Sequence, residues 1–587
     1  MSHLQLSLTD YQDETRWRWV LSDAKGNFLA DHEVSLDRKE PLYERFVDLH
    51  GYIKANKLSR EQQEQLLDDV GAWLGEVAFG GLLDTLYDER DFPATVVRVQ
   101  VPEAAQALLF HPFELAHLDG DSFAAAGIRL VYDTDATSRR KVAKDGRLRV
   151  LAIYSLPGGV SLLNLRRERY RMKRLVDELR QTRGAAVELR VIQYGATRQT
   201  LKRALQQGGG WDVIHISGHG LEGKLALEDA EGKLDIITTS ELAKLLRPTR
   251  RRVKLLTLSA CLSGAGSPEK PGSPPSGAAA QDAQPTRLPS LAQQLSQTLD
   301  CAALAMRYSV NDSFAIHFAL HLYDSLLAQK QSLPTALQVA LDDALAATYT
   351  RPPAPLSRIM PILFGARALD LTLTPPQKTP DFQLRRTGLL NFPAQPERFV
   401  GRLRPMLKAS QALAPNSPYR GILFFGEASM GKTTCALELT YRHEEERFRG
   451  YVWFKAPDEG KDIRPTLRNF LQSMENQLDL GQQGILTAHL NDPQAFSQRT
   501  LPRLQAMLKG HATLIVIDHI DNLLTKSGGW RDAKWGTLIN ALLERTAHTR
   551  LVLTSRQQPT DLQQHPALRK LRIPRLLLKE RALLNRD

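Results

Sequence analysis

The sequence predicts an α/β fold, because short apolar strands alternate with helices along most of its 587 residues. The segments RLRVLAIYS (147–155), WDVIHISGHG (211–220) and VKLLTLSAC (253–261) are nearly continuous apolar runs, as in parallel strands buried on both faces. A second strand–loop–helix pattern, GILFFGEASMGKTTCALEL (421–439), lies far downstream. The length suggests several domains, about three to five, and the two patterns predict two α/β domains in succession.

The composition is that of a globular protein, with 42% hydrophobic and 24% charged residues. The net charge of +12 comes from 77 basic and 65 acidic residues, partly gathered at 139–144 and 247–254. Such clusters are more often solvated helix faces and loops than nucleic-acid sites, so we expect no nucleic-acid partner.

Cysteine usage indicates a reducing compartment. The three cysteines, Cys261, Cys301 and Cys435, are odd in number and far apart, so no disulfide framework is predicted. Residues 1–20 hold three acidic side chains and no apolar core of a secretory signal. Since no run of 18 apolar residues occurs, we expect a cytoplasmic protein without a membrane span.

The elements before residue 150 are mixed. Alternating residues in 1–35 predict antiparallel strands with a turn at 23–26, and 38–90 is predicted helical, with a long amphipathic span from Glu61 to Leu86. Segments 96–102 and 127–133 are predicted strands. Four strands are predicted next, at 147–155, 187–195, 211–220 and 253–261. Helices are predicted between them at 162–184, 197–207 and 240–247, and Ser240 is the predicted N-cap of the last helix.

The segment 264–290 is dominated by Pro, Gly, Ser and Ala and predicts a flexible insertion. It begins three residues after Cys261. We hypothesise that it gates the site or is itself cleaved; a tolerated surface insertion explains the composition equally well. Further elements are predicted after it: helices at 291–299, 312–327 and 334–347, and strands at 301–310 and 360–365.

Two strand ends carry reactive residues. His219 and Gly220 follow one apolar strand, and Cys261 follows the strand after it. Ligands of open parallel sheets bind at the carboxyl ends of strands, and a thiol needs a base or a lowered pKa to become a nucleophile. The backbone N–H groups of Gly220 and Cys261 are candidate donors to an oxyanion.

Each of these residues has a structural alternative. A cysteine at a strand end is commonly a small core residue, and a histidine near a strand is commonly structural. His215, four residues before His219 and inside the strand, is predicted to be packed in the sheet. The pairing of two strands that both end in a reactive and a small residue favours the catalytic hypothesis for His219 and Cys261.

The segments HISGHG and TLSACLSG resemble the caspase-like CHAT domain, which belongs to a clan of cysteine peptidases with caspases, metacaspases, gingipains and separase. HPFELAHL (111–118), SLLNLRRER (161–169) and the helical 311–329 resemble it too, so residues 1–370 are assigned as a CHAT protease domain. The resemblance implies Cys261 as nucleophile, His219 as general base and acid, and no third catalytic side chain.

The resemblance gives no substrate preference. In the metacaspase-type pattern an acidic residue two positions before the cysteine selects basic P1 residues. Ser259 occupies that place, so it is the candidate residue of the substrate pocket without an acidic selector.

Residues 426–433, GEASMGKT, fit the phosphate-binding pattern GxxxxGK[ST] between a strand and a helix. Backbone N–H groups of such a loop surround phosphates, and the helix N-terminus adds positive charge. The predicted ligand of this site is ATP or ADP with Mg²⁺. Thr433 is the predicted metal ligand, and Asp518 (in LIVID, 514–518) is predicted to orient Mg²⁺ and its water. Its loop residues are Gly426, Gly431, Lys432, Thr433 and Thr434.

The segments ERFVGR (397–402) and LVLTSR (551–556) resemble the STAND class of signalling ATPases, related to NLR-type receptors. The resemblance implies Gly401 and Arg402 near the adenine, and residues 554–556, including Arg556, as a γ-phosphate sensor. His519 stands where many relatives have a second acid, and Asp521 is the next candidate to activate water. ATP hydrolysis therefore stays open.

The predicted organisation is a CHAT domain (1–370), a linker (371–396) and a STAND-type P-loop NTPase domain (397–587) that ends early for its class. We predict a cysteine endopeptidase acting on protein or peptide substrates, controlled by nucleotide and homo-oligomeric on activation, in bacterial defence or cell death. The alternatives are an inactive CHAT scaffold whose assembly nucleotide controls, and a nucleic-acid-handling NTPase. The predicted role in defence rests only on analogy with the family that the sequence resembles.

Overall fold

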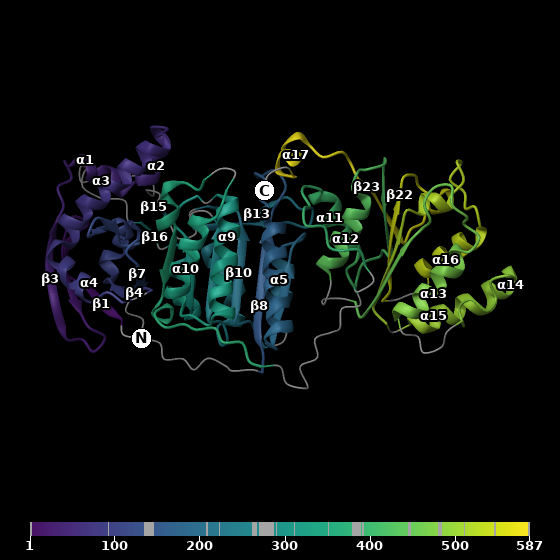
Figure 1. Cartoon of the computed structure of the whole chain (residues 1–587), viewed down its shortest axis with the longest axis horizontal. Helices are drawn as coiled ribbons and strands as arrows, with labels where there is room; N and C mark the ends of the chain where they lie inside the picture. Colours follow the sequence, from purple (N-terminus) through teal and green to yellow (C-terminus); the bar gives the residue numbers. More distant parts are fainter. Residues whose placement is uncertain are drawn as a thin grey trace, which may run out of the picture. The chain divides into compact units, whose positions relative to one another are not determined.

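The computed structural model describes the chain except residues 1–2, 92, 134–145, 207–208, 222, 261–266, 269–286, 289, 310, 350–351, 378–388, 390–391, 444–447, 479–483, 510, 545–547 and 585–587. The described chain falls into two compact units (Figure 1). The first holds residues 1–192 and 196–379, and the second holds residues 193–195 and 380–586.

The first unit is built on an eleven-stranded sheet, which confirms the predicted α/β class. Its strand order is β3-β2-β1-β4-β7-β18-β17-β14-β10-β8-β9. The block from β9 to β17 is parallel throughout, as the continuous apolar runs predict. The strands are β1 (Leu4–Asp13), β2 (Arg16–Ser22), β3 (Phe28–Ser35), β4 (Thr95–Gln100), β7 (Ile128–Asp133), β8 (Leu148–Ser155), β9 (Val187–Ile192), β10 (Val213–Gly218), β14 (Leu255–Ala260), β17 (Ala302–Met306) and β18 (Pro361–Phe364).

The strand predicted at 360–365 joins the sheet in the opposite direction. β18 pairs antiparallel with β17 and parallel with β7. The β7, β4 and β1 strands follow its direction, and β2 is antiparallel to both of its neighbours, β1 and β3, as predicted for residues 1–35. The strands from β18 to β1 therefore run opposite to the parallel block from β17 to β9, and β2 at the far edge reverses direction again between β1 and β3.

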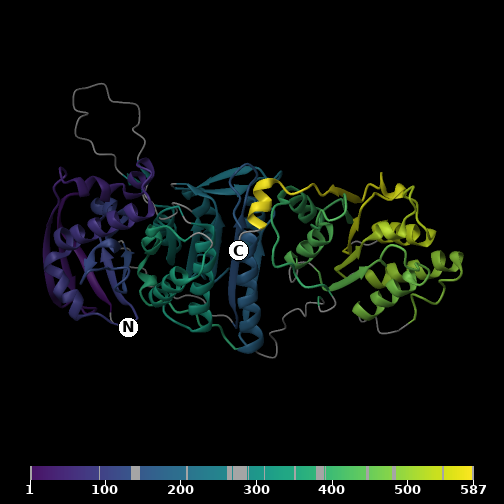
Figure 2. The same ribbon diagram turned by 45° about the horizontal axis from the view of Figure 1, so that its top comes forward.

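Helices cover both faces of the parallel block. In Figures 1 and 2, α5 lies along β8, and α9 and α10 lie side by side on the same face. Apolar residues of α6, α7 and α8 pack on the other face. The helices are α1 (Pro41–Val47), α2 (Leu49–Ala55), α3 (Arg60–Phe79), α4 (Leu83–Asp88), α5 (Leu165–Thr182), α6 (Arg198–Gln206), α7 (Thr239–Leu246), α8 (Leu291–Leu299), α9 (Asp312–Tyr323) and α10 (Leu333–Ala346).

Small ladders complete the first unit. A three-stranded sheet follows β10 and consists of β11 (Gly220–Leu221), β12 (Lys224–Glu228) and β13 (Leu234–Thr238). The two-stranded ladders are β5 (His117–Leu118) with β6 (Asp121–Ser122), and β15 (Ser267–Pro268) with β16 (Arg287–Leu288). Most of the predicted insertion 264–290 lies outside the described residues, and the described pairs 267–268 and 287–288 form the last ladder.

Two local predictions were wrong. The amphipathic span from Glu61 to Leu86 is not one helix: α3 ends at Phe79, and the backbone N–H of Gly81 donates to His32 Nδ1 (3.2 Å) instead of continuing the α-helical ladder. Two successive glycines at this point allow the helix to end with little cost in free energy. The N-cap of α7 is Thr238, not Ser240, because Thr238 and Glu241 form a reciprocal capping box.

The second unit contains a five-stranded, wholly parallel sheet in the order β20-β21-β22-β19-β23. Apolar residues of α11 and α12 pack on one face, and those of α13, α15 and α16 pack on the other. The elements are α11 (Leu403–Ala412), β19 (Gly421–Phe425), α12 (Lys432–Arg442), β20 (Gly450–Lys455), α13 (Thr466–Leu478), α14 (Pro493–Ala495), α15 (Leu501–Leu508), β21 (Thr513–Asp518), α16 (Ala533–Glu544), β22 (Arg550–Ser555), β23 (Leu568–Arg572) and α17 (Leu578–Leu584).

The last residue of β10 must be glycine. A Cβ atom on Gly218 would lie 2.6 Å from the backbone oxygen of Ser155, with which Gly218 is paired in the sheet. The absent side chain therefore lets the ends of β8 and β10 approach closely.

We predict that Gly218→Ala lowers the free energy of unfolding of the first unit by about 1–3 kcal/mol, because a backbone atom must move to admit the methyl group. The control is Gly146→Ala, since a Cβ there meets nothing within 4 Å. Thermal unfolding of both variants and the wild type measures the effect. Equal melting temperatures for the two variants would contradict the close approach.

Candidate active site

The two strands that precede the predicted catalytic residues pair in register at their carboxyl ends. Gly218, the last residue of β10, is opposite Ala260, the last residue of β14. His219 is half-buried and directly follows β10. Cys261 follows Ala260 in the sequence and lies outside the described residues, so the predicted Cys261–His219 contact stays a prediction.

The imidazole of His219 is held by a backbone carbonyl. Its Nε2 lies 2.8 Å from the carbonyl oxygen of Ser161 and 3.5 Å from the Ser161 hydroxyl. A carbonyl oxygen can only accept, so Nε2 carries the proton in the neutral ring and Nδ1 is the basic nitrogen. Within the described part of the chain, Nδ1 has no hydrogen-bond partner, which leaves it available to a thiol.

The neighbouring predicted residues have distinct surroundings. Gly220 opens β11 and pairs with Leu225 of β12. Ser259 is buried in β14 and pairs with Ser217 of β10. The roles assigned to Gly220 and Ser259, as an oxyanion donor and a pocket residue, stay predictions.

His215 is packed in the sheet, as predicted. It is 1% exposed, and its ring nitrogens contact Thr257 and Glu168. It therefore has no access to substrate. Neither Glu168 nor Ser161 was singled out by the sequence, although both lie within the segment 161–169 that carries part of the CHAT resemblance.

A second carboxylate lies beside the loop that holds His219. Asp312, the first residue of α9, accepts a hydrogen bond from the backbone N–H of Asn164 (2.8 Å). Burial raises the pKa of Asp312 from 3.8 to about 6, against the effect of that hydrogen bond. This contact joins the start of α9 to the start of α5.

In the second unit, the predicted phosphate loop has the conformation that its glycines suggest. Gly426, Ser429 and Gly431 all have positive φ (+146°, +59° and +84°). The Lys432 ammonium donates to the carbonyl of Glu427 (2.7 Å) across the loop, and burial lowers the pKa of Lys432. Thr434 is the third residue of α12, so both Thr433 and Thr434 lie in its first turn.

The two predicted magnesium residues contact each other. The Thr433 hydroxyl donates to Asp518 at the end of β21 (2.8 Å), and Thr554 donates to the same oxygen. Burial favours a neutral Asp518, but the hydrogen bonds from His519, Thr554 and Thr433 hold its pKa below the ordinary value. The hydrogen bond with Asp518 raises the pKa of His519. Asp518 is therefore kept ionised, as its predicted role toward Mg²⁺ would require.

The remaining predicted nucleotide residues also have partners. Asp521 accepts from the backbone N–H of Arg556 (3.1 Å) and pairs with its guanidinium (3.2 Å). Arg402 donates to the carbonyl of Met430 in the predicted phosphate loop (2.7 Å). Gly401 precedes it with φ +70°, and its missing Cβ leaves room for the Glu580 carboxylate.

The C-terminal segment of this unit reaches the same loop, which the sequence did not indicate. Arg575 pairs with Glu427 (3.0 Å), and the N–H of Ile573 donates to the carbonyl of Phe425 (2.8 Å). Nothing in the residue types of this segment signals that contact, because it depends on β23 lying next to β19.

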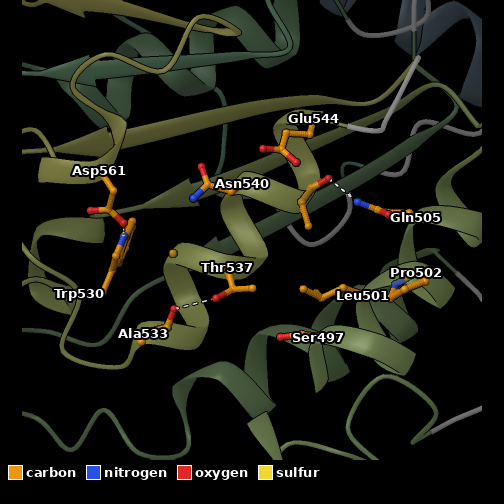
Figure 3. A pocket seen from close by; sticks show the side chains of 12 residues that line it. Ser497, Leu501, Pro502, Gln505, Trp530, Ala533, Thr537, Asn540, Glu544 and Asp561 are labelled. Carbon is orange, nitrogen blue, oxygen red and sulfur yellow. Dashed lines mark hydrogen bonds between the residues drawn. The ribbon is translucent and has the colours of Figure 1, made fainter. Parts of the chain in front are cut away.

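A cavity of about 600 Å³ lies between α15 and α16 in the second unit (Figure 3). Trp530 Nε1 donates to Asp561 on one side (2.7 Å), and Gln505 donates to the Ala541 carbonyl on the other (2.8 Å). None of the predicted site residues lines this cavity. Among the described residues, no group of three or more His, Cys, Asp or Glu side chains is placed to hold a metal ion.

The first unit is thus a mixed α/β domain on a large sheet with parallel central strands, one of which, β10, is followed by a histidine bonded to a backbone carbonyl. Within it, residues 99–354 match the family model described as the CHAT domain. This match confirms the CHAT resemblance for that part of the chain.

Solved structures also match, at low similarity. The Arg-specific cysteine proteinase gingipain R shares 12% identity over 56% of this chain and 74% of its own, with a TM-score of 0.33. Caspase-1 from Spodoptera frugiperda shares 10% identity over 40% and 90%, with a TM-score of 0.25. A Walker-type ATPase of Pyrococcus abyssi shares 14% identity over 32% and 58%, with a TM-score of 0.24. At these TM-scores the likenesses support no functional conclusion.

No curated protein gives a significant match to the sequence. Within the described residues, none of the helices is both long and apolar enough to cross a membrane.

The raised pKa of Asp312 predicts a pH-dependent stability. A carboxyl group whose pKa is higher in the folded protein binds its proton more tightly there, so its stabilising contribution is full below about pH 4 and is lost as the pH rises to about 6. Asp312→Asn should therefore gain stability relative to the wild type between pH 4 and pH 7, by up to about 3 kcal/mol at 1.36 kcal/mol per pKa unit. Melting temperatures of both proteins at pH 4.5, 5.5 and 7.0 measure it; a difference that does not change with pH would disprove the assignment.

Proposed function

We propose that the first unit is a cysteine endopeptidase acting on protein or peptide substrates, with a His219–Cys261 dyad. The observation that supports it best is the imidazole of His219. It lies at the carboxyl end of β10, next to the end of β14, with Nε2 bonded to Ser161 and Nδ1 unbonded among the described residues. In the sequence, Cys261 directly follows the adjacent strand, β14. The CHAT match covers both His219 and Cys261.

The chemistry follows from this arrangement. Nδ1 of His219 takes the proton of the Cys261 thiol, and the thiolate attacks the carbonyl carbon of the substrate. The Ser161 carbonyl stabilises the imidazolium through its bond with Nε2. The N–H groups of Gly220 and Cys261 are the proposed donors to the oxyanion. Nδ1 then returns the proton to the leaving amine, and water hydrolyses the acyl-enzyme.

We expect Cys261→Ala to lower hydrolysis of a fluorogenic peptide library, varied at P1, by about 10³-fold or more, because the nucleophile is removed. Reaction of Cys261 with iodoacetamide, followed by mass spectrometry from pH 5 to 10, gives a readout that needs no known substrate. The other two cysteines are buried and serve as internal controls. His219→Ala should shift the reaction to that of an ordinary thiol, whose pKa is about 8.5.

An inactive scaffold would give the opposite result. The wild type and Cys261→Ala would then give the same background signal with the library, and the wild-type Cys261 would react with the same pH dependence as in His219→Ala. Either result would overturn the peptidase proposal.

We further propose that the second unit binds ATP or ADP with Mg²⁺. The direct hydrogen bond between Thr433 and an ionised Asp518 supports it, since these two groups would hold the metal. The N–H groups of the loop from Gly426 to Thr434 and the Lys432 ammonium would bind the phosphates. Arg402, bonded to the loop, would lie at the base, and Arg556 at the γ-phosphate.

Lys432→Ala should weaken equilibrium binding of a fluorescent ATP or ADP analogue by at least about 10-fold, because a hydrogen bond to a charged group contributes roughly 1.5–3 kcal/mol. Lys570→Ala is the matched control, since Lys570 also donates to a backbone carbonyl (Gln563, 2.6 Å) but outside the loop. Fluorescence anisotropy with Mg²⁺ present measures both. Equal affinities for the two variants would overturn the assignment.

In the complete proposal, the nucleotide controls the peptidase. The ADP-bound second unit keeps the first inactive, and exchange for ATP leads to homo-oligomers and cleavage of cytoplasmic proteins in bacterial defence or cell death. The STAND resemblance of residues 397–402 and 551–556 supports this step, together with the presence of both units in one chain.

A further inference from the structure

A buried carboxylate connects β10 to α5 just below the proposed dyad. Glu168 is 3% exposed. One of its oxygens lies 2.9 Å from Nε2 of His215, and the other accepts from the hydroxyl of Ser217 at 2.6 Å. These two partners lie four and two residues before His219 on the same strand. The dyad chemistry described above uses none of the three.

The same network reaches the strand that precedes Cys261. Nδ1 of His215 lies 2.8 Å from the hydroxyl of Thr257, which lies 2.7 Å from the hydroxyl of Tyr323 in α9. His215 and Thr257 are register partners in β10 and β14. The network therefore joins the two strands at paired positions, and each of these positions lies four residues before a proposed catalytic residue.

One assignment of protons satisfies every group in the network. Tyr323 donates to Thr257, Thr257 donates to Nδ1 of His215, and Nε2–H of His215 and the Ser217 hydroxyl both donate to the Glu168 carboxylate. Burial raises the pKa of Tyr323 well above its ordinary value, so its phenol stays a donor. A fully satisfied buried network of this kind is rigid.

The segment that leads into α5 also binds the imidazole of His219. Ser161, whose carbonyl binds Nε2 of His219, lies in the segment that leads into α5, seven residues before Glu168. The position of His219 thus depends on two elements, β10 and the start of α5, and the Glu168 side chain joins these two elements. If they separate, the Ser161–His219 bond lengthens and the imidazole loses the tautomer that leaves Nδ1 basic.

We propose that Glu168 is a positioning residue for the His219–Cys261 dyad, acting by bonds to His215 and Ser217 that fix β10 against α5. The proposal rests on the peptidase function proposed above. Under this proposal, His215 of the HISGHG segment helps to position the dyad and is not itself a catalytic group.

The test is Glu168→Gln, which keeps the size of the side chain but replaces one acceptor oxygen by a donor, so that Ser217 and His215 cannot both be satisfied as before. The pH dependence of Cys261 alkylation by iodoacetamide should shift toward that of His219→Ala. Where a cleaved library peptide is found, kcat should fall by about 10-fold or more with KM less affected, because small displacements of reacting groups cost up to about 10²-fold. Ser217→Ala, which removes only the bond nearest His219, should shift the alkylation profile in the same direction.

Asp212→Asn is the matched control. Asp212 is equally buried (1% exposed) and directly precedes β10 at the opposite end, where it accepts from the backbone N–H of Arg149 (2.9 Å) and pairs with Arg252 (2.7 Å). It therefore joins the neighbouring chain segments as Glu168 does, but away from the dyad. We expect it to lower the melting temperature and to leave the alkylation profile of Cys261 unchanged.

The outcomes are distinguishable. If His219→Ala changes the alkylation profile but Glu168→Gln and Ser217→Ala do not, the dyad stands and the positioning role is wrong. If Asp212→Asn shifts the profile as much as Glu168→Gln, the effect is one of general stability and the positioning role is also wrong. If His219→Ala itself has no effect, the peptidase proposal fails first.

Discussion

The close parallel pairing of β8, β10 and β14 at their carboxyl ends is the constraint on which the candidate site depends. Gly218 is paired with Ser155 on one side and Ala260 on the other, and only a residue without a side chain fits beside the Ser155 carbonyl. Because the side-chain period of a strand is two, a slip of one residue would turn His215 and Ser217 to the opposite face. The register therefore decides which face of the sheet His215 and Ser217 present to α5.

The sequence was sufficient for the class of fold and for the distinction between the two histidines. Continuous apolar runs are typical of strands buried on both faces, and a histidine inside such a run differs visibly from one that follows it. His215 is accordingly buried, while His219 lies at the edge. The direction of β18 could not be predicted from sequence, since a four-residue apolar strand looks the same in either direction.

The residues that the sequence missed share a physical reason. The acceptor for His219 is a backbone carbonyl, and every residue has one, so the identity of Ser161 carries no signal. Glu168 lies in a helix rich in charged side chains, where a single buried carboxylate cannot be told from its exposed neighbours. In the second unit, the spacing of a known motif predicted the residues of the loop, but the pairing of Asp521 with Arg556 depends on which strands are adjacent.

The chemical character of the buried network favours a role at the site rather than in stability alone. Apolar side chains of similar volume would fill the space around His215 without the desolvation cost of a carboxylate, and such replacements are often neutral or stabilising in proteins. On the opposite face, the same stretches of β10 and β14 carry Ile216 and Leu258 in an apolar core. The polar groups are confined to the face that β10 shares with α5, where Ser161 meets His219. A directed hydrogen-bond network fixes an orientation as well as a distance, which non-directional apolar packing does not do. In the proposed dyad, His219 must present Nδ1 to a thiol, and that role needs a fixed orientation of the ring.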